Sequence, residues 1–145
     1  MKRIMGAIGA VVGVTLVTAF ATPQAFAGSA FAVNSASRVA RGAAVSLSVT
    51  VTCDPYTDWT GQPSSAVDVN IAFRQAVRHG IITTGSMDSG WLNICDSAAH
   101  SLRLQIEPSP YAAVKGAAIV DGVVSFNTFG GLPGPQNYTA VVKVG

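Results

Sequence analysis

Two cysteines, Cys53 and Cys95, have the clearest chemistry in this 145-residue chain. They stand far apart in the sequence, which is not the CxxC spacing of a metal site. In an exported chain such a pair is expected to form a disulfide, because the compartment is oxidising. Closing a loop of this length would stabilise the fold by about 4 kcal/mol in the chain-entropy model. Two unrelated buried thiols are the alternative.

Catalysis has little support among the remaining side chains. The histidines are His79, in "VRHG", and His100, which falls on the same face of the alternating stretch "HSLRLQIE" as its apolar residues. We expect His79 in an exposed turn and His100 at a strand end near the cysteines. No G-x-S-x-G, HExxH or P-loop pattern occurs, and no base is evident beside the serines and threonines. The prediction is a protein that is not an enzyme, with no catalytic residues and no cofactor.

Carboxylates could bind a metal ion, but their spacing does not favour it. Asp54 and Asp58 stand together in "DPYTD". Calcium needs six to eight oxygen ligands, and this spacing is not that of an EF-hand. We expect turn capping here, with calcium as the weaker alternative, and predict no metal site.

The N-terminal segment predicts export. Residues 2–3 are basic, "IMGAIGAVVGVTLVTAFA" is apolar, and "TPQAFA" ends in small residues at Ala25 and Ala27. These are the parts of a secretory signal peptide, and the short, glycine-interrupted run argues against a transmembrane anchor. We expect cleavage of residues 1–27 and one domain over residues 28–145. The protein would be secreted and extracellular, meeting the membrane only before cleavage.

The charge balance argues against polyanionic partners, namely nucleic acid and anionic lipid. The chain has nine Lys and Arg against seven Asp and Glu, and Lys2 and Arg3 belong to the signal segment. Seven residues of each sign remain, so the predicted domain has no formal net charge. Its composition therefore predicts no nucleic-acid partner and no binding to anionic lipid.

Period-two alternation predicts an all-β fold. It is cleanest in "VSLSVTVTC" (45–53) and recurs in "AVDVNIAF" (66–73), "HSLRLQIE" (100–107) and "YTAVVKV" (138–144). A half-buried antiparallel strand needs such alternation, because successive side chains point to opposite faces. About seven short strands predict a single immunoglobulin-like antiparallel β-sandwich with one disulfide; a closed barrel is the main rival.

Turn-forming stretches separate the predicted strands. Loops are expected at 54–65, at 128–136, and over "TTGSMDSG" at 83–90. The pair "DG" at 121–122 is either a bulge within one long strand or a tight hairpin turn. The stretch "AFRQAVRHG" (72–80) could form one helical turn.

The predicted disulfide also constrains strand order. Cys53 ends the second strand, and Cys95 stands just before the strand that begins near His100. A disulfide requires Cα atoms within about 7 Å. In an immunoglobulin-like order the second and fifth strands are antiparallel neighbours, so the end of one meets the start of the other.

A family resemblance follows from these stretches. "VSLSVTVTCD", "CDSAAHSLRLQIEP" and "YAAVKGAAIV", together with the signal peptide, resemble small secreted actinobacterial proteins that carry one immunoglobulin-like β-sandwich. The shared pattern covers about half of the predicted domain and implies a fold but no catalytic residues. The chain is more loosely similar to secreted apoproteins of the neocarzinostatin type, which have a cleft at one end of such a sandwich. Those usually have four cysteines, whereas this chain has two.

Aromatic residues are the best indication of function. Tyr56 and Trp59 lie in the 54–65 loop and Phe129 lies in the 128–136 loop, which an immunoglobulin-like order brings to one end. Aromatic residues on loops of a rigid scaffold commonly form binding surfaces, so Tyr56, Trp59 and Phe129 are the candidate ligand-binding residues. The alternative is that Trp59 and Phe129 fold back to cap the core.

Three functions remain open from the sequence. The first is a secreted, non-catalytic binding or surface-interaction module for an extracellular protein, a cell-wall component or a small molecule. The second is a small-molecule apoprotein with an apical cleft lined by Tyr56, Trp59 and Phe129, which would show a deep apolar pocket at the loop end. The third is an extracellular protease inhibitor or hydrolase, for which "CDPYTDW" (53–59) is the only candidate reactive loop.

Overall fold

A computed structural model describes residues 24–26 and 29–145 of the chain. The predicted signal segment lies outside the described residues, apart from the three-residue strand β1. The elements are β1 (Gln24–Phe26), β2 (Ser29–Val39), η1 (Ala40–Gly42), β3 (Ala44–Cys53), β4 (Tyr56–Thr57), β5 (Pro63–Ser64), β6 (Ala66–Arg78), β7 (Ile81–Asn93), β8 (Ala99–Ile106), β9 (Gly116–Phe126) and β10 (Gln136–Val144). The fold is all-β, as predicted.

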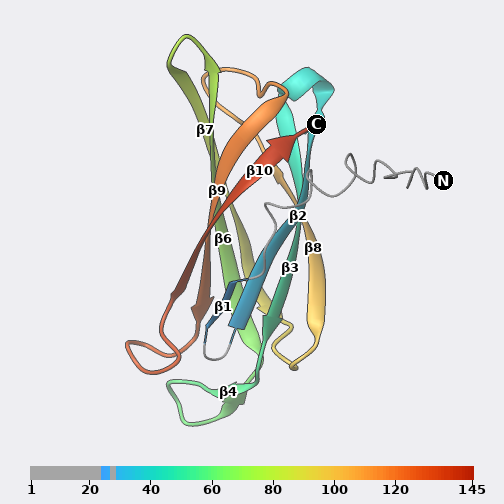
Figure 1. The fold of residues 1–145 in the computed structure, drawn as a ribbon. Coiled ribbons are helices and arrows are strands. Elements are labelled where there is room, and N and C mark those ends of the chain that lie inside the picture. The colour runs from blue at the N-terminus through green and yellow to red at the C-terminus, as the bar shows by residue number, and fades with distance from the viewer. Residues whose placement is uncertain (1–23, 27–28) are drawn as a thin grey trace, which may run out of the picture.

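The strands form a sandwich of two layers (Figure 1). The hydrogen-bonded path runs β7-β6-β9-β10-β2-β3-β8, and β1 pairs beside β2. The contact between β10 and β2 is a single parallel pair, Val144 with Ala36, whereas the other long pairings are antiparallel. One layer is therefore β7-β6-β9-β10 and the other β2-β3-β8. β7 and β8 are the two ends of this path, so the sheet is not a closed barrel.

The predicted strand neighbours around the cysteines are confirmed. β3 and β8 pair antiparallel, with Val51 opposite His100 and Val45 opposite Ile106. The disulfide therefore lies where β3 ends and β8 begins. Figure 1 places β4 at this end of the sandwich, with the β6–β7 hairpin and η1 at the opposite end.

The core is built from the alternating residues of the strands. Val45, Leu47, Val49, Val51 and Cys53 are all buried on β3, as are the odd residues from Val67 to Phe73 on β6. On β8 the inner face is buried at Leu104 and Ile106, and on β10 at Tyr138, Val142 and Val144. The period-two pattern thus identified the buried face of each predicted strand correctly.

The predicted loop at 83–90 is wrong, because these residues lie within the 13-residue strand β7. A Cβ atom added at Gly85 would lie 2.4 Å from Cγ2 of Ile106. The glycine therefore makes room for a core side chain from the other layer. The polar residues beside it are tolerated because β7 is an edge strand: β6 is its strand partner in the sheet, and on the other side Thr84 bridges the loop residue Ser109.

The stretch 72–80 forms no helical turn, because β6 continues to Arg78 and the chain turns at His79 and Gly80, both at positive φ. The turn at His79 is exposed, as predicted. Asp121 and Gly122 form neither a bulge nor a hairpin turn: the register of β9 with β10 and with β6 is unbroken there. A Cβ atom at Gly122 would lie 2.8 Å from the ring of Phe31, so this glycine accommodates that ring.

Candidate binding surface at the disulfide end

The predicted disulfide is present and buried. The sulfurs of Cys53 and Cys95 are 2.10 Å apart, the Cα atoms are 4.6 Å apart, and both residues are almost fully excluded from solvent. Cys95 belongs to the segment 94–98, which leaves β7 in one layer and enters β8 in the other. The Ser97 amide also donates to the Cys53 carbonyl, at 2.9 Å. The bond thus fixes a crossover between the layers to the end of β3.

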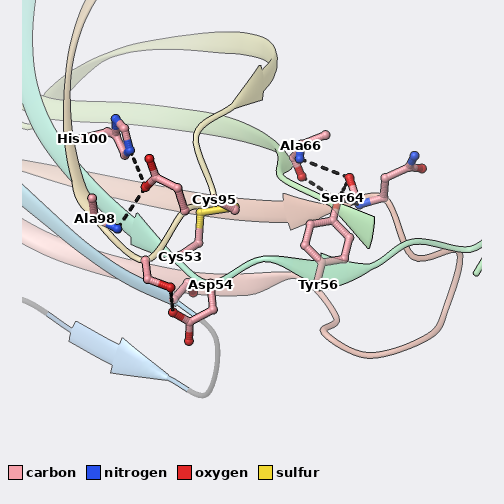
Figure 2. Close-up of a disulfide and its surroundings, with 12 residues drawn as sticks. Cys53, Asp54, Tyr56, Ser64, Ala66, Cys95, Ala98 and His100 are labelled. Carbon is pink, nitrogen blue, oxygen red and sulfur yellow. Dashed lines mark hydrogen bonds and ion pairs between the residues drawn. A yellow bond between two sulfur atoms is a disulfide. The ribbon is translucent and has the colours of Figure 1, made fainter. Parts of the chain in front are cut away.

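Polar pairs surround the disulfide (Figure 2). The Ser97 hydroxyl donates to Asp54 at 2.8 Å, and Nε2 of His100 lies 2.7 Å from Oδ1 of Asp96. The hydrogen bond with His100 is the main cause that lowers the pKa of Asp96, followed by the bond from the Ala98 amide. Each group is bound to a carboxylate, so this is not the serine–histidine contact that activates a nucleophile.

Tyr56 is a structural residue that ties the loops together. Its hydroxyl donates to the Ala66 carbonyl and accepts from the Asn127 amide at 2.9 Å. Its ring packs edge-on against Phe126, with ring centroids 5.2 Å apart. Of the three predicted ligand-binding aromatics, Tyr56 is therefore the one that caps the core.

Trp59 stands on a rigid turn between β4 and β5. Oδ1 of Asp58 accepts hydrogen bonds from the Thr60 amide and hydroxyl and from the Gln62 amide, at 2.6–3.0 Å. These bonds, that of the Thr60 side chain first, lower the pKa of Asp58. The turn capping predicted for Asp58 is confirmed, whereas Asp54 bonds across the loop to Ser97 instead.

Trp59 and Phe129 meet at the tip of this end. Their rings are edge to face with centroids 5.5 Å apart, and the Trp59 amide donates to the Asn127 carbonyl at 3.1 Å. The exposed fractions are 59% for Trp59, 86% for Phe129 and 91% for Leu132, so these side chains do not cap the core. We call Trp59, Phe129 and Leu132 the aromatic rim.

The loop behind Phe129 is held by its own hydrogen bonds. The Thr128 hydroxyl donates to the Pro133 carbonyl at 2.8 Å, and the Gly131 amide donates to the Thr128 carbonyl at 2.8 Å. Thr128 is buried although it is polar, because these bonds satisfy it. The rim therefore consists of exposed apolar side chains on a backbone fixed by buried polar contacts.

An open groove lies beside the rim. It has a volume of about 390 Å³ and is lined by Asp54, Pro55, Tyr56, Leu132, Pro133, Gly134 and Gln136. Tyr56 lines it, but Trp59 and Phe129 do not. The arrangement thus differs from the cleft predicted for a small-molecule carrier, in which all three aromatics share one pocket.

A second polar cluster, which the sequence analysis did not predict, lies on the outer face of β6 and β7. Asp68 lies opposite Trp91, and the register shift beyond this pair brings Asp88 next to it. Burial, and then the hydrogen bond and negative charge of Asp88, raise the pKa of Asp68 to about 6. Only the pairing of β6 with β7 brings the two carboxylates together, because they are 20 positions apart in the chain.

Within the described residues, no group of three or more His, Cys, Asp or Glu side chains could hold a metal ion. The same part of the chain contains no helix of the length and hydropathy needed to span a membrane. Comparisons with protein-family models, with curated proteins and with solved structures find no match to this chain.

Proposed function

We propose that this protein is a secreted, non-catalytic, immunoglobulin-like module that binds an extracellular partner through its aromatic rim. The observation that supports this proposal most strongly is the pair of exposed rings, Trp59 and Phe129. They come from different loops and contact each other in solvent. Exposed aromatics that are held rigidly lose little conformational freedom on binding and are enriched at interface centres.

Two further observations support the immunoglobulin-like class and the secretion. The first, second and fifth long strands share one layer, and the third, sixth and seventh share the other, which an immunoglobulin-like order requires. The fourth long strand, β7, joins the second of these layers, whereas the seven-strand constant-type order has it in the first. Export is supported by the disulfide, because such bonds persist in oxidising compartments, and by the signal-peptide pattern of residues 1–27.

Affinity capture tests the proposal directly. The protein is immobilised, and components of culture supernatant and cell wall are passed over the wild type, Trp59→Ala and Trp91→Ala. Trp91 is a matched control: its exposed fraction is 57%, against 59% for Trp59, but it lies on the outer face of β7. We expect a component that Trp91→Ala retains and Trp59→Ala loses. Equal capture by all three proteins would refute a binding role for the rim.

The groove beside the rim supports a second candidate, a carrier of a small apolar molecule. Its volume of about 390 Å³ falls within the range of small-ligand sites. Extraction of the purified protein with organic solvent, followed by mass spectrometry, would reveal a carried compound. A compound that survives Trp59→Ala but is lost on Tyr56→Ala with the fold intact would favour the groove over the rim.

A further inference from the structure

The charges of the molecule are segregated along its long axis. Five exposed or half-buried carboxylates lie in the half nearest the disulfide: Asp54, Asp58, Asp68, Asp88 and Asp96. The cations gather toward the other end, which carries Arg38, Arg41, Arg74, Arg78, Lys115 and Lys143, with Arg103 near the middle of β8. No lysine or arginine among residues 29–145 lies in the disulfide half. We call the two regions the acidic end and the basic end.

Few of these charges are neutralised locally. In the described part of the chain the salt bridge of a lysine or arginine is Arg74–Asp121, at 3.1 Å, and Asp96 is hydrogen-bonded to His100. Arg78, Lys115 and Lys143 are exposed and belong to neither. The carboxylate side chains of residues 29–145 on the side of the basic end are Glu107 and Asp121, and Asp121 is the partner of Arg74. Each end therefore presents a field of one predominant sign.

The distance between the ends exceeds the range of ionic screening. β6 has 13 residues, which span roughly 40 Å at about 3.3 Å per residue. The Debye length at physiological salt is about 8 Å, so the electrostatic potential at each end is set by the charges of that end and is not cancelled by those of the other. A chain with seven residues of each sign beyond the signal segment has no overall repulsion from a second copy. Two copies attract when opposite ends face each other.

The apolar features of the two ends are also complementary. The acidic end projects the aromatic rim. The basic end has an apolar groove of about 370 Å³, lined by Val77, Arg78, Ile81, Tyr111, Ala112 and Val114. The side chain of Tyr111 is half exposed there, and that of Ile81 is 38% exposed. Interface centres are commonly built from aromatic anchors that fill apolar pockets, with polar and charged residues at the edge.

We propose that the protein associates head to tail with further copies of itself, the aromatic rim of one copy entering the Tyr111 groove of the next. This inference rests on the proposed binding role of the rim and names its partner as a second copy of the chain. The contact joins two different surfaces, so each added copy leaves one rim and one groove open. Such a heterologous contact produces open chains unless the rotation between copies closes a ring.

Sedimentation velocity tests this inference on protein made from the full coding sequence in an exporting bacterial host. We expect species larger than a dimer to increase with concentration at about 50 mM salt and to fall at least tenfold in population at about 500 mM salt. A wild type that stays monomeric up to millimolar concentration at low salt overturns the proposal.

Two single variants remove one surface each. Arg78→Glu reverses the charge beside the groove, and Phe129→Asn removes a rim ring at a position whose φ of 38° asparagine tolerates. Each variant alone should be monomeric. Their equimolar mixture should form dimers and nothing larger, because only one intact rim and one intact groove remain per pair. Arg103→Glu and Trp91→Ala, which change neither surface, should assemble like the wild type.

The alternatives give different patterns. A symmetric rim-to-rim dimer would form in Arg78→Glu alone and would not be restored by mixing, which overturns the head-to-tail contact. Association of the basic end with an anionic polymer would leave the pure protein monomeric. If the wild type is monomeric but the rim captures another component, this inference fails and the proposed function stands. If the rim captures nothing and no assembly forms, both fail.

Discussion

The two ends of the sandwich each anchor a segment that crosses between the layers, but they use different bonds. At the disulfide end, segment 94–98 is held covalently through Cys95. At the opposite end, segment 107–115 is held by hydrogen bonds: backbone bonds join Ser109 to Thr84 and the Ala113 amide to the Gly42 carbonyl, and buried polar side chains bind the segment as well. Gln75 donates to the Val114 carbonyl at 2.8 Å and accepts from the Val114 amide at 3.0 Å, and the Thr83 hydroxyl donates to the Tyr111 carbonyl.

This difference explains where apolar residues can be exposed. At the disulfide end the covalent bond and the Tyr56 hydroxyl hold the backbone, so Trp59 and Phe129 are not needed for packing. At the opposite end the loop backbone itself is bound to the core residues Gln75 and Thr83, and its apolar side chains line a groove. One end therefore projects its apolar side chains and the other recesses them.

Removing the disulfide should cause the largest loss of unfolding free energy among the changes that distinguish the two ends. The double variant Cys53→Ser with Cys95→Ser is expected to lose about 4 kcal/mol of unfolding free energy, because the loop between the two residues becomes unconstrained in the unfolded chain. Urea unfolding of both proteins measures the loss. A reductant should destabilise the wild type by a similar amount and leave the double variant unchanged. A loss below about 1 kcal/mol would show that the bond does not anchor this end.

Breaking the polar anchor of the other end should cost less. Gln75→Ala removes both bonds to Val114 and leaves its buried backbone groups unsatisfied, so we expect a loss of about 2–3 kcal/mol. Gln105→Ala is the matched control, because Gln105 is exposed on β8, and should stay within about 0.5 kcal/mol of the wild type. If the two glutamine variants unfold at the same denaturant concentration, the Gln75 side chain does not anchor segment 107–115, and its backbone bonds to Thr84 and Gly42 suffice.

Tyr56→Phe, at the disulfide end, should lose less unfolding free energy than removal of the disulfide or of the Gln75 side chain. The variant keeps the ring on Phe126 but removes the hydroxyl that joins Ala66 and Asn127, for an expected loss of about 1 kcal/mol. Hydrogen exchange at the Asn127 amide should become faster, which reports the local bond directly. Unchanged exchange at Asn127 would contradict the role given to this hydroxyl.

The pH dependence should be smaller still and specific to Asp68. The pKa of Asp68 in the folded protein is raised to about 6. Between about pH 4 and pH 6 the folded protein therefore keeps a proton on Asp68, whereas the unfolded chain has already released it. The resulting stability is complete below about pH 4 and is lost as the pH rises through 6. Because Asp68 is only partly buried, we expect the change to remain under about 1 kcal/mol.

Asp68→Asn should abolish this decline and be more stable than the wild type at pH 7. Asp58→Asn is the contrasting control, because the pKa of Asp58 is lowered and its contribution is lost only as the pH falls below the ordinary range of an aspartate. Thermal unfolding at pH 4, 5, 6 and 7 measures all three proteins. A difference between Asp68→Asn and the wild type that is constant across this range would contradict the account.

The core strands could be predicted because the alternation of apolar and polar residues along each strand follows the alternation of buried and exposed positions. Val45–Cys53 shows this best, since every odd residue there is buried. β7 could not be predicted, because its inner position at Gly85 is filled by Ile106, a residue from another strand. A glycine that makes room for a distant side chain has the same sequence signature as a glycine in a loop.

The candidate site was predictable only at the level of loops. The sequence placed Tyr56, Trp59 and Phe129 at one end, but it could not separate the tyrosine that anchors the loops from the rings that project into solvent. That distinction depends on the Asn127 amide and the Ala66 carbonyl reaching the Tyr56 hydroxyl. The charge segregation was equally hidden, because it depends on the direction in which each strand runs.

The aromatic rim is proposed to serve binding and to contribute nothing to the stability of the core. The most direct measurement is the unfolding free energy of the double variant Trp59→Ala with Phe129→Asn. We expect it within about 0.5 kcal/mol of the wild type, because both rings are largely exposed and pack edge to face on each other. A loss of about 2 kcal/mol or more would mean that the rings cap the core, and the binding surface proposed for this end would be wrong.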